Sequence, residues 1–172
     1  MDKKDCTKIF EQSSRLLLVM DNNFAIAPPT ETSSITAIVH DEALAERIEN
    51  IKVLVAEDMP LNQLLIKIIL NDFGFDVDIA GNGKIAIENL EENKYDNILM
   101  DLQMPEMNGF EATAHIRGKM NMQIPIIALT ADVTTVDLEK CKAIGMNDYI
   151  SKPVDEKLLY SKIITYLKES TN

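Results

Sequence analysis

Cysteine is scarce in this sequence, and the two cysteines lie far apart. Cys6 and Cys141 are separated by most of the chain, so they form none of the close spacings of zinc sites. A secreted domain held together by disulfides is therefore excluded as a class. We predict two plain thiols in a reducing compartment, with neither a bridge nor a cysteine-built metal site.

Long apolar runs are also missing. No run approaches the roughly 18–20 residues that a membrane-spanning helix needs. The longest candidate near the start, at 16–20, is too short for a signal-peptide core and is followed by Asp21 and Asn22. We therefore expect a cytoplasmic chain whose segment here makes no membrane contact.

Basic residues are outnumbered by acidic ones. The chain has 17 Lys and Arg against 28 Asp and Glu, which gives a net charge of −11. A nucleic-acid surface needs clustered basic residues to offset phosphate charge, so we expect no nucleic-acid partner. An acidic balance suits a protein that holds a divalent cation, although most of these acids are expected to be solvated surface.

Short apolar runs and helical periodicity alternate regularly from Ile51 onward. The patterns predict strands at 52–56, 76–80, 97–100, 126–130 and 148–151. They predict helices at 60–72, 84–93, 110–119, 135–144 and 155–167. Five strand–helix pairs with short loops indicate an α/β fold in which a parallel sheet is covered by helices on both faces.

The burial patterns of the strands also predict their order. The first, third and fourth strands are continuously apolar, as expected of central strands buried on both sides. The second alternates apolar and acidic residues, and the fifth is short, so both are expected at edges. This predicts the flavodoxin-like, doubly wound order 2-1-3-4-5.

Residues 1–50 have a different composition from the rest. They contain candidate helices at 9–20 and 41–49 around a stretch at 27–34 rich in Pro, Thr and Ser. We predict a partly helical N-terminal linker or extension at 1–50 and a second domain at 51–172.

Chemically active side chains stand where the predicted strands end. Glu57 and Asp58 follow the first strand, Asp101 follows the third, Thr130 ends the fourth, and Lys152 follows the fifth. In this fold, ligands bind at the carboxyl ends of the strands. Like charges held close together need a counter-ion, and Mg²⁺ prefers oxygen ligands.

Such an arrangement suits phosphoryl transfer, which depends on positioning and charge stabilisation. Asp101 would be the nucleophile, and Lys152 and Thr130 would bind phosphoryl oxygens. Taken singly, Asp58 could instead cap the following helix, Glu57 could be solvated, and Tyr149 could be half-buried packing. Their joint placement at strand ends favours the functional interpretation.

Four segments of the sequence closely resemble the receiver domains of two-component phosphorelay systems (response regulators). They are VLVAEDMPLNQ at 53–63, MDLQMPEMNG at 100–109, ALTA at 128–131 and YISKP at 149–153. The segments stand in the order and at the spacing of that family, over residues 51–168. The sequences of these segments are most similar to those of the C-terminal receivers of hybrid sensor histidine kinases.

The resemblance implies a role for each matched residue. Asp101 would be the phospho-acceptor and a metal ligand, while Glu57, Asp58 and the backbone carbonyl of Gln103 would also hold Mg²⁺. Thr130 and Tyr149 would form a switch pair, and Lys152 would contact the phosphoryl group. A cis peptide is expected between Lys152 and Pro153. Met59 departs from the family, which often has asparagine there, and this affects only the rim of the metal site.

The resemblance also implies partners and an output. The donor would be a phospho-histidine on a kinase or phosphotransfer domain, and phosphorylation would switch the face made by the fourth helix, fifth strand and fifth helix. A homodimer through that face is a further expectation. Only 20 residues follow Lys152 and the last helix takes them up, so we expect either a stand-alone receiver or the C-terminal piece of a hybrid kinase.

Two other functions stay open at this point. A degenerate receiver could act only as a protein-interaction module, although the intact acidic residues and Lys152 disfavour it. An aspartyl-nucleophile phosphatase of related fold would carry a second acid two residues past the nucleophile. Gln103 stands there instead, so we expect self-catalysed phosphoryl transfer and autodephosphorylation rather than an enzyme with turnover.

Overall fold

A computed structural model of the chain describes residues 51–131 and 135–169. The helices predicted at 9–20 and 41–49, and the linker between them, lie outside the described residues. Within the described ranges, no helix is long and apolar enough to cross a membrane.

Strands and helices alternate throughout the described part of the chain. The strands are β1 (Lys52–Ala56), β2 (Asp76–Ala80), β3 (Asn97–Asp101), β4 (Ile126–Thr130) and β5 (Asp148–Ser151). The helices are α4 (Pro60–Asp72), α5 (Gly83–Glu92), α6 (Gly109–Gly118), α7 (Thr135–Ala143) and α8 (Glu156–Glu169). Every element predicted from residue 51 onward is present, and the predicted bounds differ from these by at most two residues.

The five strands form one parallel sheet in the order β2-β1-β3-β4-β5. This confirms the predicted order and the predicted edges. Strands β3 and β4 are buried along their whole length, whereas β2 and β5 each keep exposed positions. Burial on both faces explains why the central strands lack polar alternation.

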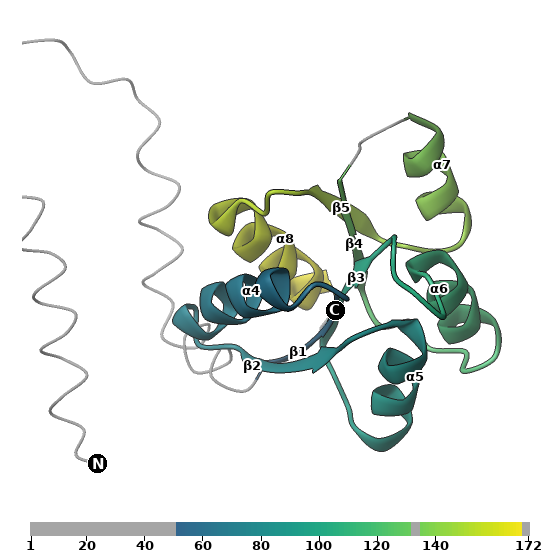
Figure 1. The fold of residues 1–172 in the computed structure, drawn as a ribbon, viewed down its shortest axis with the longest axis horizontal. Helices are drawn as coiled ribbons and strands as arrows, with labels where there is room; N and C mark the ends of the chain where they lie inside the picture. The colour runs from purple at the N-terminus through teal and green to yellow at the C-terminus, as the bar shows by residue number, and fades with distance from the viewer. Residues whose placement is uncertain (1–50, 132–134, 170–172) are drawn as a thin grey trace, which may run out of the picture. The chain divides into compact units, whose positions relative to one another are not determined.

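Helices cover both faces of the sheet, so two apolar cores form (Figure 1). Helices α5, α6 and α7 contribute to one core, which contains Leu54, Ile98 and Met100 from the strands. Helices α4 and α8 contribute to the other, which contains Val55 and Leu99. Successive strand residues point to opposite faces, so one buried strand supplies both cores.

Local signals set where the helices begin and end. Pro60 occupies the first turn of α4, and Gly74 follows its end with a φ of +87°, a conformation that favours glycine. Helix α6 begins with a capping box in which Asn108 and Glu111 bond each other's backbone N–H groups. These signals place each helix start close to the carboxyl end of the strand before it.

Gly109 brings the start of α6 against the end of β3. A Cβ atom at this position would overlap the backbone carbonyl oxygen of Asp101. The Gly109 amide donates to the carbonyl of Leu102, and the Leu102 amide donates to the carbonyl of Leu129. Only glycine allows this close approach, which fixes the loop that follows Asp101.

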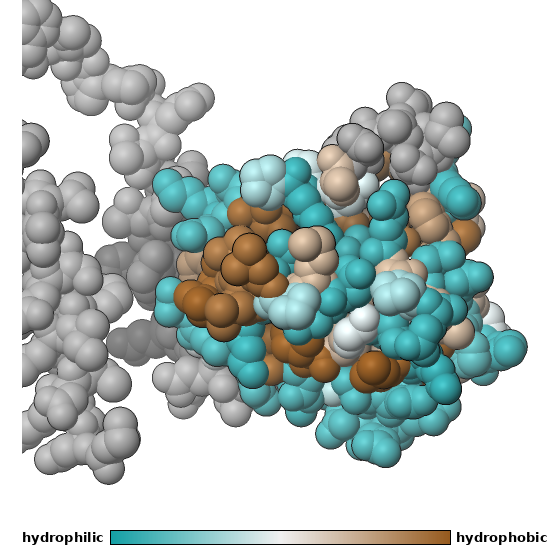
Figure 2. Space-filling model, viewed as in Figure 1, coloured by the Kyte–Doolittle hydropathy of each residue, from teal (hydrophilic) through white to brown (hydrophobic). Residues whose placement is uncertain are grey.

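The outer face of α4 carries an apolar stripe. Leu61, Leu64, Leu65 and Ile68 are exposed by 73%, 56%, 46% and 49%, and their spacing places them on one side of the helix. Figure 2 shows the resulting hydrophobic patch over α4. We call these four residues the outer stripe of α4. The opposite side of the helix packs Ile66, Ile69 and Leu70 into the core.

Candidate functional site

Three carboxylates meet at the carboxyl ends of β1 and β3, as predicted. One oxygen from each of Glu57, Asp58 and Asp101 lies within 4.8 Å of the other two. The sheet order causes this meeting, because β1 and β3 are neighbours and end at the same edge. The helix-cap alternative for Asp58 is not seen, since Met59 is the residue before α4 and no side chain caps it.

Glu57 is fully buried, so the alternative that it is solvated is wrong. Its Oε1 atom accepts hydrogen bonds from the Asn62 side-chain amide at 3.1 Å and from the Met59 amide at 3.2 Å. Its Oε2 atom lies 2.6 Å from the Lys152 ammonium. Among the described residues, this ammonium is the partner of Oε2. One oxygen of this carboxylate is therefore anchored and the other faces the site.

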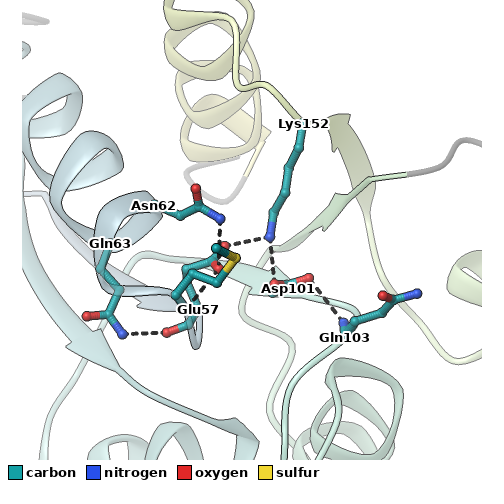
Figure 3. A network of polar contacts seen from close by, with 7 residues as sticks. Glu57, Asn62, Gln63, Asp101, Gln103 and Lys152 are labelled. Carbon is teal, nitrogen blue, oxygen red and sulfur yellow. Dashed lines mark hydrogen bonds and ion pairs between the residues drawn. The ribbon is translucent and has the colours of Figure 1, made fainter.

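Lys152 joins the two buried carboxylates of the site (Figure 3). Its Nζ lies 2.6 Å from Asp101 Oδ2 and 2.6 Å from Glu57 Oε2. Burial disfavours the charged ammonium, but the hydrogen bond to Asp101 and the attraction of both carboxylates outweigh it and raise the pKa of Lys152. The lysine therefore stays charged at neutral pH and partly neutralises the acidic pocket.

Asp101 is 5% exposed and its environment disfavours its charge. Burial raises the pKa of the Asp101 carboxyl, and the hydrogen bonds from Lys152 and from the Gln103 amide only partly offset this. The Gln103 amide lies 3.1 Å from Asp101 Oδ1. An additional cation would remove the remaining electrostatic cost.

The backbone of the last two strands places Lys152. Its amide donates to the Thr130 carbonyl at 2.7 Å, which extends the pairing of β4 and β5. The peptide bond between Lys152 and Pro153 is cis, as predicted. The lysine side chain therefore starts at the same sheet edge as the carboxylates.

Thr130 and Tyr149 occupy different environments. Thr130 is buried at the end of β4, one residue beyond Leu129, the strand partner of Asp101. Tyr149 on β5 is 37% exposed, and Lys162 Nζ lies 5.4 Å from the centre of its ring. The tyrosine thus lies on the outer surface of the edge strand β5.

Sequence reasoning missed two residues that hold Glu57. The Asn62 amide bonds the Glu57 carboxylate, and the Gln63 side-chain amide bonds the Glu57 backbone carbonyl at 2.6 Å (Figure 3). It also missed the ion pair between Lys152 and Glu57. The only signal in the sequence was the position of both amides in the first turn of the helix after the acid pair.

This fold and this site define a class of protein. An acidic pocket with a charged lysine, placed at the carboxyl ends of a 2-1-3-4-5 parallel sheet, is the arrangement of the signalling domains of two-component phosphorelays. The family model described as the response regulator receiver domain matches residues 53–164. The chain therefore belongs to the response regulator receiver family.

Its relatives include hybrid histidine kinases. The chain is 48% identical over 124 residues to hybrid signal transduction histidine kinase I of Dictyostelium discoideum, and 39% identical over 135 residues to sensor protein EvgS of Escherichia coli. The matches cover 67% and 76% of this chain but only 7% and 11% of those relatives. The chain thus spans a small part of each of these kinases.

Solved structures agree with this assignment. The receiver domain of a Pseudomonas aeruginosa sensor histidine kinase, described with a magnesium ion coordinated in its active site cleft, is 36% identical with a TM-score of 0.64. The match covers 69% of this chain and 98% of that one. A Francisella response regulator receiver domain is 33% identical with a TM-score of 0.66, covering 70% and 99%.

Proposed function

We propose that this receiver accepts a phosphoryl group on Asp101 in a magnesium-dependent reaction. One observation carries the proposal: three carboxylates converge within 4.8 Å of one another beside a lysine that bridges two of them. The arrangement concentrates negative charge where a phosphoryl acceptor is needed and supplies one fixed positive charge for the incoming group.

The residues present fit a magnesium ion. Carboxylate oxygens are the ligands that Mg²⁺ prefers, and three carboxylates lie together here beside one ammonium, which leaves the pocket with a net negative charge. Glu57, Asp58 and Asp101 would hold the ion, together with the carbonyl of Gln103. When bound, the ion would neutralise charge on the carboxylates and on the transferring phosphoryl group.

The chain's own residues account for the transfer step. An oxygen of Asp101 forms a bond to phosphorus while the bond from phosphorus to the donor nitrogen breaks, and the leaving imidazole takes its proton from solvent. Lys152 would bind an oxygen of the incoming phosphoryl group, because its ammonium already lies 2.6 Å from Asp101 Oδ2. Thr130 offers a hydroxyl donor from the neighbouring strand.

The proposed donor is a phospho-histidine on a kinase or phosphotransfer domain. The outer stripe of α4 supports a protein donor, because α4 begins two residues after Asp58 and its apolar face is exposed. A donor histidine must reach Asp101, so its protein must cover the rim of the site. The similarity to hybrid kinases supports the same donor class, whether the chain works alone or as part of such a kinase.

The proposed output is a change at the face formed by α7, β5 and α8. Thr130 would donate to a phosphoryl oxygen and move inward, and Tyr149 would turn from its exposed position into the space released. A homodimer through this face is part of the proposal. Sedimentation of the chain with and without beryllofluoride would test it, and an unchanged monomer would contradict it.

Two broader assignments also stay proposals. The receiver would begin at Ile51, after an N-terminal extension at 1–50, and the protein would work in the cytoplasm. The completeness of the sheet and its helices from Lys52 supports the first. Localisation of a fluorescently tagged full-length protein would test the second.

Magnesium titration followed by NMR tests the metal site. We expect amide shifts to cluster around Glu57, Asp58 and Asp101, and Asp58→Ala to weaken binding by at least tenfold. Shifts scattered over the surface, or wild-type affinity in Asp58→Ala, would show that the site is wrongly assigned.

A further inference from the structure

We propose that Asn62 is a positioning residue of the acceptor site. Its side-chain amide holds Oε1 of the buried Glu57 carboxylate, so that Oε2 faces Asp101 and the place of the cation. The inference rests on the proposed function and adds to it a residue outside the acidic cluster, the lysine and the switch pair.

The two carboxylate oxygens of Glu57 have different partners. Oε1 accepts from Asn62 Nδ2 at 3.1 Å and from the Met59 amide at 3.2 Å. Oε2 is paired with the Lys152 ammonium at 2.6 Å, and no backbone or amide donor of the described residues contacts it. The two donors on Oε1 therefore decide which oxygen is left for the site.

Helix α4 gives the Asn62 amide a fixed direction. The Gln63 amide nitrogen donates to the Met59 carbonyl at 3.0 Å, which makes the first turn regular. The Gln63 side chain donates to the Glu57 carbonyl at 2.6 Å and ties the same turn to the end of β1. The backbone next to Asn62 is thus fixed by the two bonds of Gln63, and the short Asn62 side chain has little freedom to turn away.

Loss of the Asn62 donor would leave the carboxylate poorly oriented. Only the Met59 amide would remain on Oε1, while Lys152 would still attract the whole group. Glu57 is fully buried, so water cannot easily replace the missing donor. We expect the carboxylate to lose its fixed orientation beside Lys152 and to offer a worse ligand oxygen to a cation.

The substitution Asn62→Leu tests this, because leucine keeps a similar shape and removes the donor. We expect Mg²⁺ affinity, measured by NMR titration, to fall about tenfold, a common effect of removing a group that orients a metal ligand. The melting temperature without metal should change by no more than a few degrees. Asn71→Leu is the matched control, because Asn71 is exposed at the far end of the same helix, and it should bind Mg²⁺ as the wild type does.

A second readout needs no metal. The Asn62 side-chain amide resonances should lie away from free-amide positions in the wild type, and should move toward them in Glu57→Leu, which removes the acceptor. If Asn62→Leu binds Mg²⁺ within twofold of the wild type, or if Asn62 resonates as a free amide, the inference is overturned. A lower melting temperature with unchanged Mg²⁺ affinity would also overturn it, by showing a merely structural role. Absence of Mg²⁺ binding in the wild type would overturn the proposed function itself, and this inference with it.

Discussion

Asp101 lies at the carboxyl end of a central strand, where burial acts on its charge before any ligand arrives. Its pKa is raised chiefly by that burial, with Lys152 and the Gln103 amide opposing the effect. The acidic partner Glu57 adds to the shift. The charged form of Asp101 therefore costs the folded protein some stability, which is common for groups at active sites.

Removal of the Asp101 charge should stabilise the metal-free protein. The folded chain binds the Asp101 proton more tightly than the unfolded chain, so this group favours folding at acidic pH and the contribution is lost as the pH rises through the raised pKa. We expect Asp101→Asn to melt a few degrees above the wild type at pH 7 in EDTA, with the difference shrinking as the pH falls toward 4. The measurement is a series of thermal melts, and a lower melting temperature for the variant at pH 7 would contradict it.

At the scale of elements, helix α4 contributes to the core, to the candidate site and to the exposed surface. Its inner side packs on the sheet, its first turn holds Glu57, and its outer stripe is exposed next to the proposed acceptor site. Exposed apolar side chains spaced along one helix face are suited to packing against another helix. The outer stripe of α4 should therefore affect the rate of phosphoryl transfer from a protein donor and not from a small-molecule donor.

The substitution Leu64→Glu should separate the two kinds of donor. A charge at the centre of the stripe would have to be buried on docking, so transfer from the autophosphorylated core of a related hybrid histidine kinase should slow by tenfold or more. Phosphorylation by acetyl phosphate should be unchanged within twofold. Asn93→Glu adds the same charge at an exposed position after α5 and serves as the control. Equal kinase-dependent rates for Leu64→Glu and the wild type would rule out the stripe as a docking surface.

Thr130 and Tyr149 should couple Asp101 to α7. A phosphoryl group shifts this equilibrium only through its different interaction with the two states, here chiefly one hydrogen bond from Thr130. Hydrogen bonds to charged groups are worth roughly 1.5–3 kcal/mol, which corresponds to about a ten- to hundredfold change in population. With beryllofluoride bound, Thr130→Ala should shift the amides of Lys140, Ile144 and Met146 much less than the wild type does. Full shifts in that variant would mean that the coupling runs through other residues.

The elements were predictable because their signals are local. Pro60 and Gly74 mark the ends of α4, and the acidic alternation of Asp76 and Asp78 marks an edge strand. Helix ends were less certain: α8 extends to Glu169, two residues beyond its predicted end, because no glycine or proline stops it.

The acidic cluster followed from the sheet order alone, since residues at the carboxyl ends of neighbouring strands must meet. The hydrogen bond from Asn62 to Glu57 and the ion pair of Glu57 with Lys152 could not be predicted from the sheet order. They depend on side-chain directions set by packing, and nothing at residues 57, 62 and 152 in the sequence distinguishes a bonded pair from exposed polar groups.

At the scale of the whole molecule, the described residues by themselves form a five-stranded sheet with helices on both faces. Among the described residues, the sheet begins at Lys52 and both cores are built from Ile51 onward. Removal of residues 1–45 should therefore leave the melting temperature within a few degrees of that of the full chain. Thermal melts of both proteins measure this, and a drop well beyond that range would mean that the segment contributes to the packed domain.

The central claim is that Asp101 is the phospho-acceptor, and mapping the modified residue tests it most directly. The full chain is treated with acetyl phosphate and Mg²⁺, the acyl phosphate is reduced with borohydride, and the peptides are analysed by mass spectrometry. We expect one modified residue, Asp101, with no modification in EDTA or in Asp101→Asn at neutral pH. Modification at another aspartate, or labelling of Asp101→Asn at the wild-type rate, would contradict the account.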